Sequence, residues 1–581
     1  MNTHTAQDTP FIPAPRITTV AGYLLARLAE AGVISVFGVP GDDNLPILDA
    51  VAARPGLAWI GMATEQGAGY AADSYARQRG LGAVVTTFGV GELSAANAIA
   101  GACAESVPVV HIVGTPALEA RETGVTLHHN LPGRDYGHFA RMAAEITAAQ
   151  ADLRAVTAPE QIDRVLGTAL ATSRPVYLTI PADVAGLPVL APAGPLSRAV
   201  PEPDPAVVAA FTGHARRVLA VADSASLLAG HLAARHRVTA QVRDLAIAGN
   251  LPVAVLSVAK GDFPESDPRF AGLYAGPASA KRARVAVEDA DVLITAGVTP
   301  ADTVLGGAHQ LPARRRIDLA PEQASIDGTV YPGIGLRQSL AILAAAVRST
   351  PPRAGLADLP PFETPAEARG APLTQAGLWA RVQDLLRPGD LLIADQGTAF
   401  YGAAGLTLPD GAQLMGQPLW ASTGWSVPAA LGASLAAPER RVVLIAGDGA
   451  MQQTAAELGT LLGQGLAPVI VVVNNGGYTT ERAISQPGAG YHQIPAWVWT
   501  ALPAALGPAT QPVALRAVTS HELGWALVAA SYHAAAGRPV LIEAVLGAGD
   551  APPLLQDLTR ALAASVHSET PAAAGRELAG G

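Results

Sequence analysis

Two apolar, β-branched runs near the C-terminal end of the chain each lead directly into a short polar motif. RVVLIAG ends at Gly447-Asp448-Gly449 and PVIVVV ends at Asn474-Asn475, so that Asn475 stands 27 positions after Asp448. The runs are typical of buried parallel strands, and the amphipathic stretch TAAELGTLLGQG between them predicts a crossover helix. Asp448 and Asn475 are therefore expected at the carboxyl ends of neighbouring strands, where open α/β sheets bind ligands. A carboxylate, an amide oxygen and a free carbonyl in the glycine turn suit Mg²⁺ that holds a diphosphate.

Composition narrows the classes of protein that this chain can represent. Its 581 residues exceed what one hydrophobic core supports, so two to four domains are expected. Hydrophobic residues make up 50% and charged residues only 15%, against about 25% charged in typical domains, which favours large cores and interfaces between subunits. The formal charge of −10 and the lack of a basic stripe with aromatic residues argue against a nucleic-acid partner.

Neither a membrane span nor an export signal is expected. No apolar run approaches the roughly 18 residues of a spanning helix, and the N-terminal stretch has no basic-then-apolar signal organisation. Cys103 is the only cysteine, which excludes internal disulfides and a cysteine zinc cluster. The expected compartment is the cytoplasm.

Strand-like and helix-like segments alternate in three blocks. The blocks are separated by proline-rich stretches near 190–205 and at roughly 349–372, which are typical of linkers. The predicted fold class is α/β, with three doubly wound parallel-sheet domains. They are expected at 17–190, 205–348 and 373–548, followed by an amphipathic helix at 550–566. No internal repeat is visible in the sequence.

A lone GDG is more often an ordinary turn, but the strand–GDG–helix–strand–NN unit at this spacing is far more specific. It resembles the cofactor motif of thiamine diphosphate enzymes. From about residue 17 to 565 the chain resembles the thiamine diphosphate-dependent 2-oxo acid decarboxylases, and most of all the indolepyruvate, phenylpyruvate and branched-chain members of the pyruvate and indolepyruvate decarboxylase group. The resemblance implies an N-terminal pyrimidine-binding domain, a central Rossmann-like domain, a C-terminal diphosphate- and Mg²⁺-binding domain, and a lid formed by the last helix.

The resemblance also implies which residues hold the cofactor and its metal. Mg²⁺ is expected on the side chains of Asp448 and Asn475 and on the backbone carbonyl of Gly477. Thiamine diphosphate is expected to contact Glu65, Thr398, Thr423, Gly447, Asp448, Gly449, Ala450, Asn475, Gly477 and Tyr478.

The cofactor site departs from the family pattern at two positions. Gly476 stands where relatives usually have an acidic residue, which is expected to loosen the turn but to leave the side-chain ligands intact. Thr423 replaces the bulky apolar residue, often isoleucine, that wedges under the cofactor and enforces its bent shape. Threonine trades a methylene for a hydroxyl, so the bend is expected to be held less firmly.

Glu65 lies in ATEQGAGYAAD, at the place of the family's cofactor-activating glutamate. A carboxylic acid there donates to N1′ of the aminopyrimidine and favours the imino tautomer, which removes the C2 proton and makes the ylide. Taken alone, this residue is more typical of a helix-start glutamate that complements the helix dipole. The matching context is what favours the catalytic interpretation.

Four further residues match the polar lining of the family's reaction pocket. They are Asp42 in GVPGDDNL, His128 and His129 in TLHHNL, and Glu481 in TTERAI. Two acids and two imidazoles can supply the proton that the former carboxyl-bearing carbon needs and remove the one on the hydroxyl. Alternatively, GDDN is an ordinary turn and the adjacent histidines form a turn or a fortuitous metal site. Adjacent side chains are expected to point to different sides, which argues against joint chelation of one zinc ion.

The resemblance also implies which residues line the substrate pocket. Phe400 stands where pyruvate and indolepyruvate enzymes have a small residue and where branched-chain enzymes have phenylalanine. Thr480 makes the wall more polar than the valine or isoleucine of relatives. For the two leucines of the last helix, core packing is a near-equal interpretation. The expected substrate-binding residues are Gln396, Phe400, Thr480, Ile484, Leu558 and Leu562.

The resemblance implies non-oxidative decarboxylation of a 2-oxo acid to an aldehyde and CO₂ through a ylide and an enamine. The alternatives are a carboligase of the acetolactate synthase type, which lacks the His128-His129 pair and usually carries FAD, and a non-catalytic thiamine diphosphate-binding scaffold. A dehydrogenase built on Gly89-Val90-Gly91 fails, because the third glycine spacing and the acidic ribose binder are missing. An arylpyruvate and a branched-chain 2-oxo acid both remain candidate substrates. The family implies at least a homodimer, with a homotetramer as the expected form.

Overall fold

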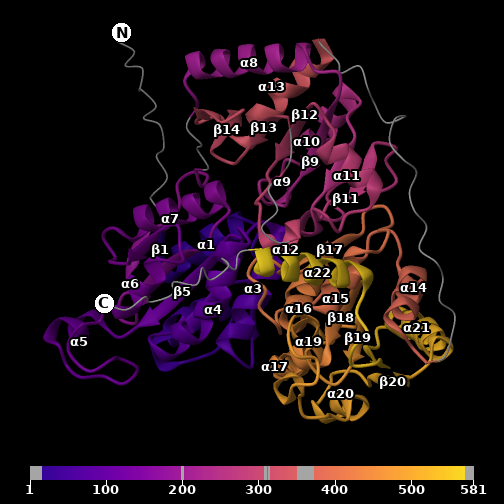
Figure 1. Ribbon diagram of the computed structural model, residues 1–581. Helices are drawn as coiled ribbons and strands as arrows, with labels where there is room; N and C mark the ends of the chain where they lie inside the picture. Colours follow the sequence, from indigo (N-terminus) through magenta and orange to yellow (C-terminus); the bar gives the residue numbers. More distant parts are fainter. Residues whose placement is uncertain (1–15, 198–201, 307–310, 312–313, 350–371, 569–581) are drawn as a thin grey trace, which may run out of the picture.

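The structure, a computed structural model, describes residues 16–197, 202–306, 311, 314–349 and 372–568, with side chains on the last helix up to residue 560. Three lobes follow one another along the chain (Figure 1). Each is built on one large sheet covered by helices. Among the described residues, no helix is both long enough and apolar enough to span a membrane.

The N-terminal lobe contains a six-stranded sheet in which every pair of neighbours is parallel. Its order is β3-β2-β4-β5-β7-β6. The strands are β2 (Ser35–Gly38), β3 (Ala58–Gly61), β4 (Gly82–Thr87), β5 (Val109–Thr115), β6 (Gln150–Asp152) and β7 (Val176–Pro181), and the main helices are α1 (Val20–Glu30), α2 (Leu45–Ala52), α3 (Glu65–Arg79), α4 (Val90–Ala104) and α7 (Ala158–Thr172). A short antiparallel pair, β1 (Ile17–Thr19) and β8 (Pro188–Leu190), joins the two ends of this lobe.

The C-terminal lobe repeats this connectivity. Its sheet has the order β17-β16-β18-β19-β21-β20 and is also parallel throughout. The strands are β16 (Leu391–Ala394), β17 (Gln413–Met415), β18 (Val442–Gly447), β19 (Val469–Asn474), β20 (Val513–Ala517) and β21 (Val540–Val545). The helices are α14 (Gln375–Leu385), α15 (Thr398–Ala404), α16 (Ser426–Ala436), α17 (Asp448–Gln453), α18 (Ala456–Gly463), α19 (Thr479–Ile484), α20 (Leu502–Ala505), α21 (Ser520–Ala535) and α22 (Pro553–Ser568). The N-terminal and C-terminal lobes therefore share one strand order, although no repeat is visible in the sequence.

The middle lobe carries a seven-stranded sheet of order β11-β10-β9-β12-β13-β14-β15. The strands are β9 (Ala225–Ala229), β10 (Val253–Val255), β11 (Phe270–Leu273), β12 (Val292–Ala296), β13 (Arg315–Leu319), β14 (Gln323–Ile326) and β15 (Thr329–Pro332). The first five are parallel in a Rossmann-like order. Its helices are α8 (Pro205–Ala220), α9 (Leu232–Arg235), α10 (Thr239–Gly249), α11 (Lys281–Glu288), α12 (Asp302–Leu305) and α13 (Leu336–Ser349).

The α/β fold class predicted from the sequence is confirmed, with one difference at the edge of the middle sheet. Strands β14 and β15 are antiparallel to their neighbours, so this sheet is mixed rather than wholly parallel. The reversal between them uses Asp327 and Gly328, which both have positive φ angles (47° and 83°). An Asp-Gly pair between two short strands is a strong hairpin signal, because both residues tolerate the left-handed region.

The N-terminal and C-terminal lobes share one hydrophobic core. It combines residues of α3 and α4 with residues of α16 and α18. Helices α3 and α16 lie against each other closely: a Cβ on Gly432 would fall 2.0 Å from the carbonyl oxygen of Ala71. Only glycine fits at that crossing, and the two sheets are consequently held in a fixed relation within one chain.

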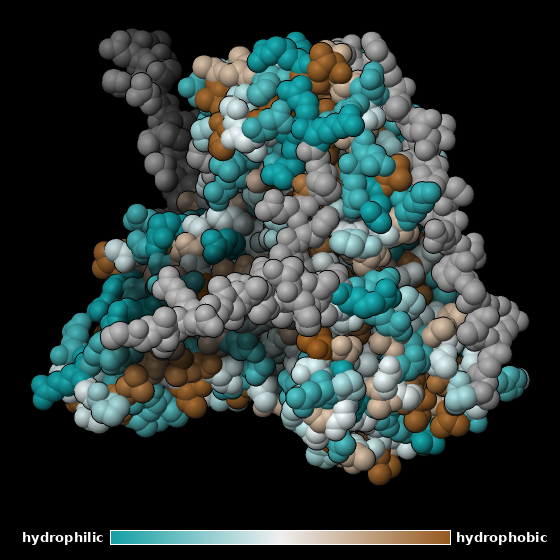
Figure 2. Space-filling model, viewed as in Figure 1, coloured by the Kyte–Doolittle hydropathy of each residue, from teal (hydrophilic) through white to brown (hydrophobic). Residues whose placement is uncertain are grey.

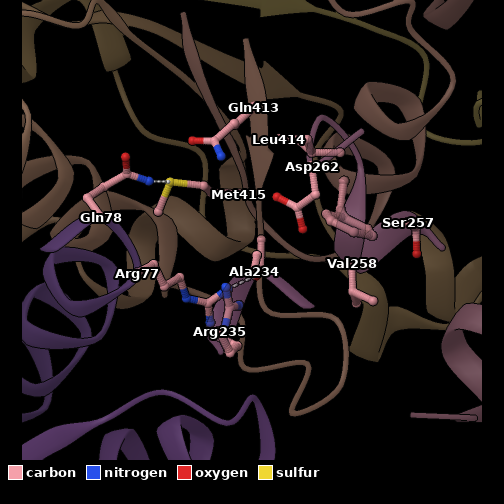
Figure 3. Close-up of a pocket in the computed structure, with 12 residues that line it drawn as sticks. Arg77, Gln78, Ala234, Arg235, Ser257, Val258, Asp262, Gln413, Leu414 and Met415 are labelled. Carbon is pink, nitrogen blue, oxygen red and sulfur yellow. Dashed lines mark hydrogen bonds between the residues drawn. The ribbon is translucent and has the colours of Figure 1, made fainter. Parts of the chain in front are cut away.

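A small cavity of about 40 Å³ lies where the three lobes meet (Figure 3). Buried charges line it, among them Arg77 of α3, Arg235 of α9 and Asp262. Arg77 contacts Asp73 at 2.6 Å, donates to the carbonyl of Gly416 at 2.7 Å and lies over the Trp425 ring. Burial raises the pKa of Asp262 to about 7, although the nearby Arg235 guanidinium acts in the opposite direction.

We expect Asp262→Asn to stabilise the protein at pH 8 and to have a smaller effect at pH 5.5. The folded protein binds the Asp262 proton more tightly than the unfolded chain, so this group favours folding at low pH and loses that contribution as the pH rises through about 7. Thermal unfolding at the two pH values measures the difference, with the exposed Asp49→Asn as the control. Equal effects of Asp262→Asn at both pH values would contradict the assignment.

Candidate active site

Asp448 and Asn475 lie at the carboxyl ends of adjacent strands, as the sequence predicts. Strands β18 and β19 pair in parallel, with Gly447 opposite Val473. Asp448 is the first residue of α17, directly after Gly447, and Asn475 follows β19. Both side chains are nearly inaccessible, with 2% and 5% of their surface exposed. Two strands that end together thus bring a carboxylate and an amide to one point.

Three oxygen atoms converge at this point. The side-chain oxygen of Asn475 lies 2.8 Å from the carbonyl oxygen of Gly477 and 3.3 Å from Oδ1 of Asp448. Without a cation between them these oxygens repel, and the amide would gain two hydrogen bonds by rotating its nitrogen inward. Octahedral Mg²⁺ needs ligand oxygens roughly 3 Å apart, since its bonds are about 2.0–2.1 Å long. The donor set therefore fits Mg²⁺.

The turn after Asn475 is held by contacts that offset the extra glycine at position 476. Gly476 donates its N–H to Oδ2 of Asp448 at 2.8 Å. Arg482 of α19 donates to the carbonyls of Gly476 and Ala548 at 2.8 and 3.2 Å. Gly477 has a φ of 136°, and a Cβ on it would lie 1.9 Å from the carbonyl oxygen of His492. Arg482 and the neighbouring backbone therefore fix the turn although position 476 is a glycine.

Tyr478 and Ala450 complete the surroundings of the three converging oxygens. The ring of Tyr478 lies over Gly449, where a Cβ would approach it to 2.8 Å. Ala450 is buried one residue further along α17. Thr479 donates to the carbonyl of Ala548 at 3.0 Å, which ties the start of α19 to the segment after β21.

Residues that follow β16 and β17 lie at the same edge of the C-terminal sheet. Thr398 begins α15 after β16, and Thr480 of α19 lies 3.6 Å from the position that a Cβ on Gly397 would take. Thr423 accepts a hydrogen bond of 2.6 Å from Gln453, the last residue of α17. The hydroxyl at this departure from the family pattern is thus paired within the chain, and it fixes Thr423 to the helix that begins with Asp448.

Glu65 is the first residue of α3 and is half-buried. Its Oε1 atom lies 3.2 Å from the point that a Cβ on Gly91 would occupy, so the glycine leaves room for the carboxylate. The turn before it is bound by Glu457 of α18, which accepts hydrogen bonds from the backbone N–H of Ala63 and Thr64 at 3.2 and 3.0 Å. A buried carboxylate of the C-terminal lobe therefore positions the start of α3.

Asp42, His128 and His129 form one cluster in the N-terminal lobe. Asp42 follows β2, and its Oδ2 lies 2.9 Å from Nε2 of His128. The two imidazole rings lie with centroids 4.2 Å apart. The expectation that adjacent histidines point to different sides is wrong here, because His129 has a φ of 62° and turns its ring toward that of His128.

The predicted substrate residues occupy different environments. Gln396 donates to the Tyr401 hydroxyl at 3.3 Å. Phe400 is 1% exposed, and its ring fills the space beside Gly416 and contributes to the cavity between the lobes. Ile484 is exposed, whereas Leu558 of α22 is buried near Gly306. Leu562 lies on the same helix, but its side chain falls outside the described part of the chain.

Within the described residues, no hydrogen bond or ion pair joins the Asp42, Glu65, His128 and His129 set to the Gln396, Thr423, Asp448, Asn475 and Glu481 set. Glu481 lies exposed on α19. The two sets lie on different lobes, each at the carboxyl end of a sheet with the same strand order, and we call them the two half-sites.

Sequence reasoning missed Glu457, Arg482 and Tyr401. Glu457 is fully buried, and burial raises its pKa. The signal was available, since Glu457 is the only charged residue in the stretch TAAELGTLLGQG. Arg482 directly follows the predicted Glu481, and Tyr401 directly follows the predicted Phe400. In both cases the hydrogen bond at the site is made by the residue next to the predicted one.

Three family models match the chain in order. The N-terminal thiamine pyrophosphate-binding domain of thiamine pyrophosphate enzymes matches residues 18–135, their central domain matches 213–347, and their C-terminal thiamine pyrophosphate-binding domain matches 398–544. These matches and the oxygen cluster at Asp448 define the class as a thiamine pyrophosphate enzyme.

Relatives narrow the class further. The chain is 47% identical to an alpha-keto-acid decarboxylase of Mycolicibacterium paratuberculosis over 549 residues, which are 93% of this chain and 96% of that protein. It is 47% identical to one of Mycobacterium tuberculosis, with 94% and 98% covered, and 46% identical to one of Mycobacterium ulcerans, with 94% and 96% covered. The chain belongs to the thiamine diphosphate-dependent 2-oxo acid decarboxylase family.

Proposed function

We propose that this protein converts a bulky apolar 2-oxo acid into the aldehyde and CO₂, with thiamine diphosphate bound through Mg²⁺. The substrate class is an arylpyruvate, such as indolepyruvate or phenylpyruvate, or a branched-chain 2-oxo acid. The observation that carries the proposal is the convergence of the Asp448, Asn475 and Gly477 oxygens, since it supplies a diphosphate-bound metal with its protein ligands. The proposed compartment is the cytoplasm.

When bound, thiamine diphosphate supplies the electron sink that makes loss of CO₂ from the 2-oxo acid possible. The residues of the chain would then transfer protons and hold the cofactor and the substrate in position. Glu65 would hold a carboxyl at the aminopyrimidine, and Asp448 and Asn475 would hold the metal at the diphosphate end. Oδ2 of Asp42 lies 2.9 Å from Nε2 of His128, a spacing that suits a pair that passes a proton. Glu481 is placed on α19, directly after the metal-binding turn.

The proposal is tested by assaying aldehyde and CO₂ formation from pyruvate, 2-oxoisovalerate, 2-oxoisocaproate, phenylpyruvate and indolepyruvate. Turnover should require both thiamine diphosphate and a divalent metal. A protein that binds the cofactor but releases CO₂ from none of these acids is the scaffold alternative. A product that contains two joined substrate fragments, in place of the aldehyde, would indicate the carboligase alternative.

We further propose that the active unit is at least a homodimer and is completed as a homotetramer. The two half-sites in one chain support this, because each would be completed by the other half from a second copy. Large apolar side chains are exposed on α4 (Val90 and Leu93) and on α21 (Trp525, Val528 and Tyr532). Figure 2 shows hydrophobic residues gathered on the lower part of the N-terminal lobe and on the outer side of the C-terminal lobe.

We expect the specific activity and the fraction of chains in the oligomer to rise together as the protein concentration increases. Burial of the exposed apolar side chains drives association, and dilution into monomers should separate Glu65 from the cofactor that it serves. Sedimentation velocity, run alongside activity at the same concentrations, measures this. An active, cofactor-loaded monomer would refute the proposal.

For the substrate, we expect Phe400→Ala to raise the kcat/KM for indolepyruvate relative to that for 2-oxoisovalerate by about 10–200-fold. A misfit of one or two methylenes in an apolar pocket has an effect of that size. Because Phe400 is 1% exposed, the change should also cost about 3–5 kcal/mol of stability, and the ratio of the two kcat/KM values is the proper measure since it is independent of the active fraction.

The matched control for Phe400 is Tyr401→Phe. It removes the hydroxyl that accepts the hydrogen bond from Gln396 and keeps the ring. Phe400→Ala could leave the ratio of the two kcat/KM values unchanged while Tyr401→Phe alters it. In that case the prediction that Phe400 limits substrate size is wrong, and Tyr401 forms the pocket wall.

A further inference from the structure

Asp42, His128 and His129 offer three ligand atoms to one point. One oxygen of Asp42 and one ring nitrogen of each histidine all lie within 4.8 Å of one another. Among the described residues, this is the one group in which three such atoms from histidine, cysteine, aspartate or glutamate meet. The left-handed backbone at His129 creates the cluster, since it brings two consecutive rings to the same side.

The backbone that carries the three ligands is anchored although the side chains are exposed. Asn44, which is fully buried, accepts from the N–H of Gly41 at 3.0 Å and donates to the carbonyl of Val39 at 3.0 Å. These bonds fix the turn that bears Asp42. The carbonyl oxygen of His129 lies 1.9 Å from the position that a Cβ on Gly89 would take. The backbone of His129 therefore packs directly against the turn between β4 and α4. Little reorganisation is needed to bring the ligands together.

The donor types select the ion. Two imidazole nitrogens and one carboxylate suit zinc and other divalent first-row transition ions, whereas Mg²⁺ prefers oxygen ligands only. Bonds of about 2.0–2.2 Å place tetrahedral ligand atoms roughly 3.3–3.6 Å apart. The three ligand atoms already lie within 4.8 Å of one another on exposed side chains, so modest side-chain rotation would bring them to that spacing. Three protein ligands leave one coordination position open.

We propose that Asp42, His128 and His129 bind a divalent transition-metal ion such as Zn²⁺, at a site separate from the Asp448–Asn475 site, and that the bound ion inhibits decarboxylation. The ion takes the imidazole lone pairs and the carboxylate that would otherwise move protons, so these groups can no longer act on the reacting atoms. The inhibition rests on the proposed function; the binding itself does not.

The binding arm uses the full-length protein loaded with thiamine diphosphate and kept in millimolar Mg²⁺. Zn²⁺ is titrated by calorimetry, and Co²⁺ is titrated by its visible absorption, which reports nitrogen ligands and coordination number. We expect one Zn²⁺ per chain, and affinity at least 10-fold weaker in both His129→Gln and Asp42→Asn. The control is His138→Gln, because His138 lies 3.7 Å from Asp135 in a histidine–aspartate pair that lacks a third such ligand among the described residues.

The activity arm separates this proposal from the proposed function. Wild-type turnover should fall as Zn²⁺ fills the site and return when a zinc-selective chelator is added with Mg²⁺ in excess. Unchanged Zn²⁺ affinity in both His129→Gln and Asp42→Asn would overturn the site, and full turnover with the site filled would overturn the inhibition. Absence of turnover on every 2-oxo acid before zinc is added would instead refute the proposed function and leave the binding result standing.

Discussion

Glu65→Gln should lower turnover by about 10²–10⁴-fold, the range in which a positioned acid–base group contributes. Glutamine preserves the shape of the side chain beside Gly91 and leaves the Glu457-bound turn before it intact. It cannot pass a proton to N1′ of the aminopyrimidine. The loss should therefore lie in activation of the cofactor, with little change in cofactor or metal affinity.

Exchange of the C2 proton of bound thiamine diphosphate for deuterium, followed by NMR, measures that activation directly. Glu65→Gln should nearly abolish exchange. Glu481→Gln is the matched control, because it makes the same chemical change on the exposed face of α19 and should spare exchange while slowing a later step. If Glu65→Gln and the wild-type protein exchange at equal rates, Glu65 is not the activating group.

The sequence predicted the parts of the site that depend on strand ends. Asp448 and Asn475 were placed together because parallel neighbours end at the same edge of a sheet, and the structure has β18 beside β19. The α/β class followed from the same alternation of buried runs and amphipathic stretches. The sequence does not predict the shared strand order of the first and last lobes, because strand order depends on long-range pairing and the two lobes have no visible sequence repeat.

The contacts between lobes could not be predicted from local patterns. In the sequence, Glu457 is simply one charged residue of an amphipathic helix. In the structure it accepts hydrogen bonds from backbone N–H groups almost 400 positions earlier, because α18 packs against the start of α3. The orientation of His129 depends on its left-handed backbone and on its seat against Gly89. Successive helical residues differ in direction by about 100°, so a motif match alone does not establish whether Phe400 or Tyr401 faces substrate.

The second large effect is expected at the metal. Asp448→Ala should weaken binding of both Mg²⁺ and thiamine diphosphate by more than about 100-fold. Removal of a residue that only orients a metal ligand already costs about 10–100-fold, and Asp448 is itself a ligand in the proposed site. Its Oδ2 also accepts the N–H of Gly476 at 2.8 Å, so the substitution loosens the turn that presents the Gly477 carbonyl.

Asn474→Ala and Asn475→Ala form a matched pair for this prediction. The two residues are adjacent, but Asn474 donates to Glu543 at 2.7 Å, whereas the side-chain oxygen of Asn475 faces Asp448 and Gly477. Calorimetry of cofactor binding, with and without Mg²⁺, should show Asn475→Ala failing together with Asp448→Ala while Asn474→Ala binds normally. In the proposed site the metal would link the protein to the diphosphate, so affinity for the two ligands should fall together. Full-strength thiamine diphosphate binding by Asp448→Ala, or by wild-type protein after chelation, would mean that the diphosphate is held elsewhere and that the three converging oxygens serve another purpose.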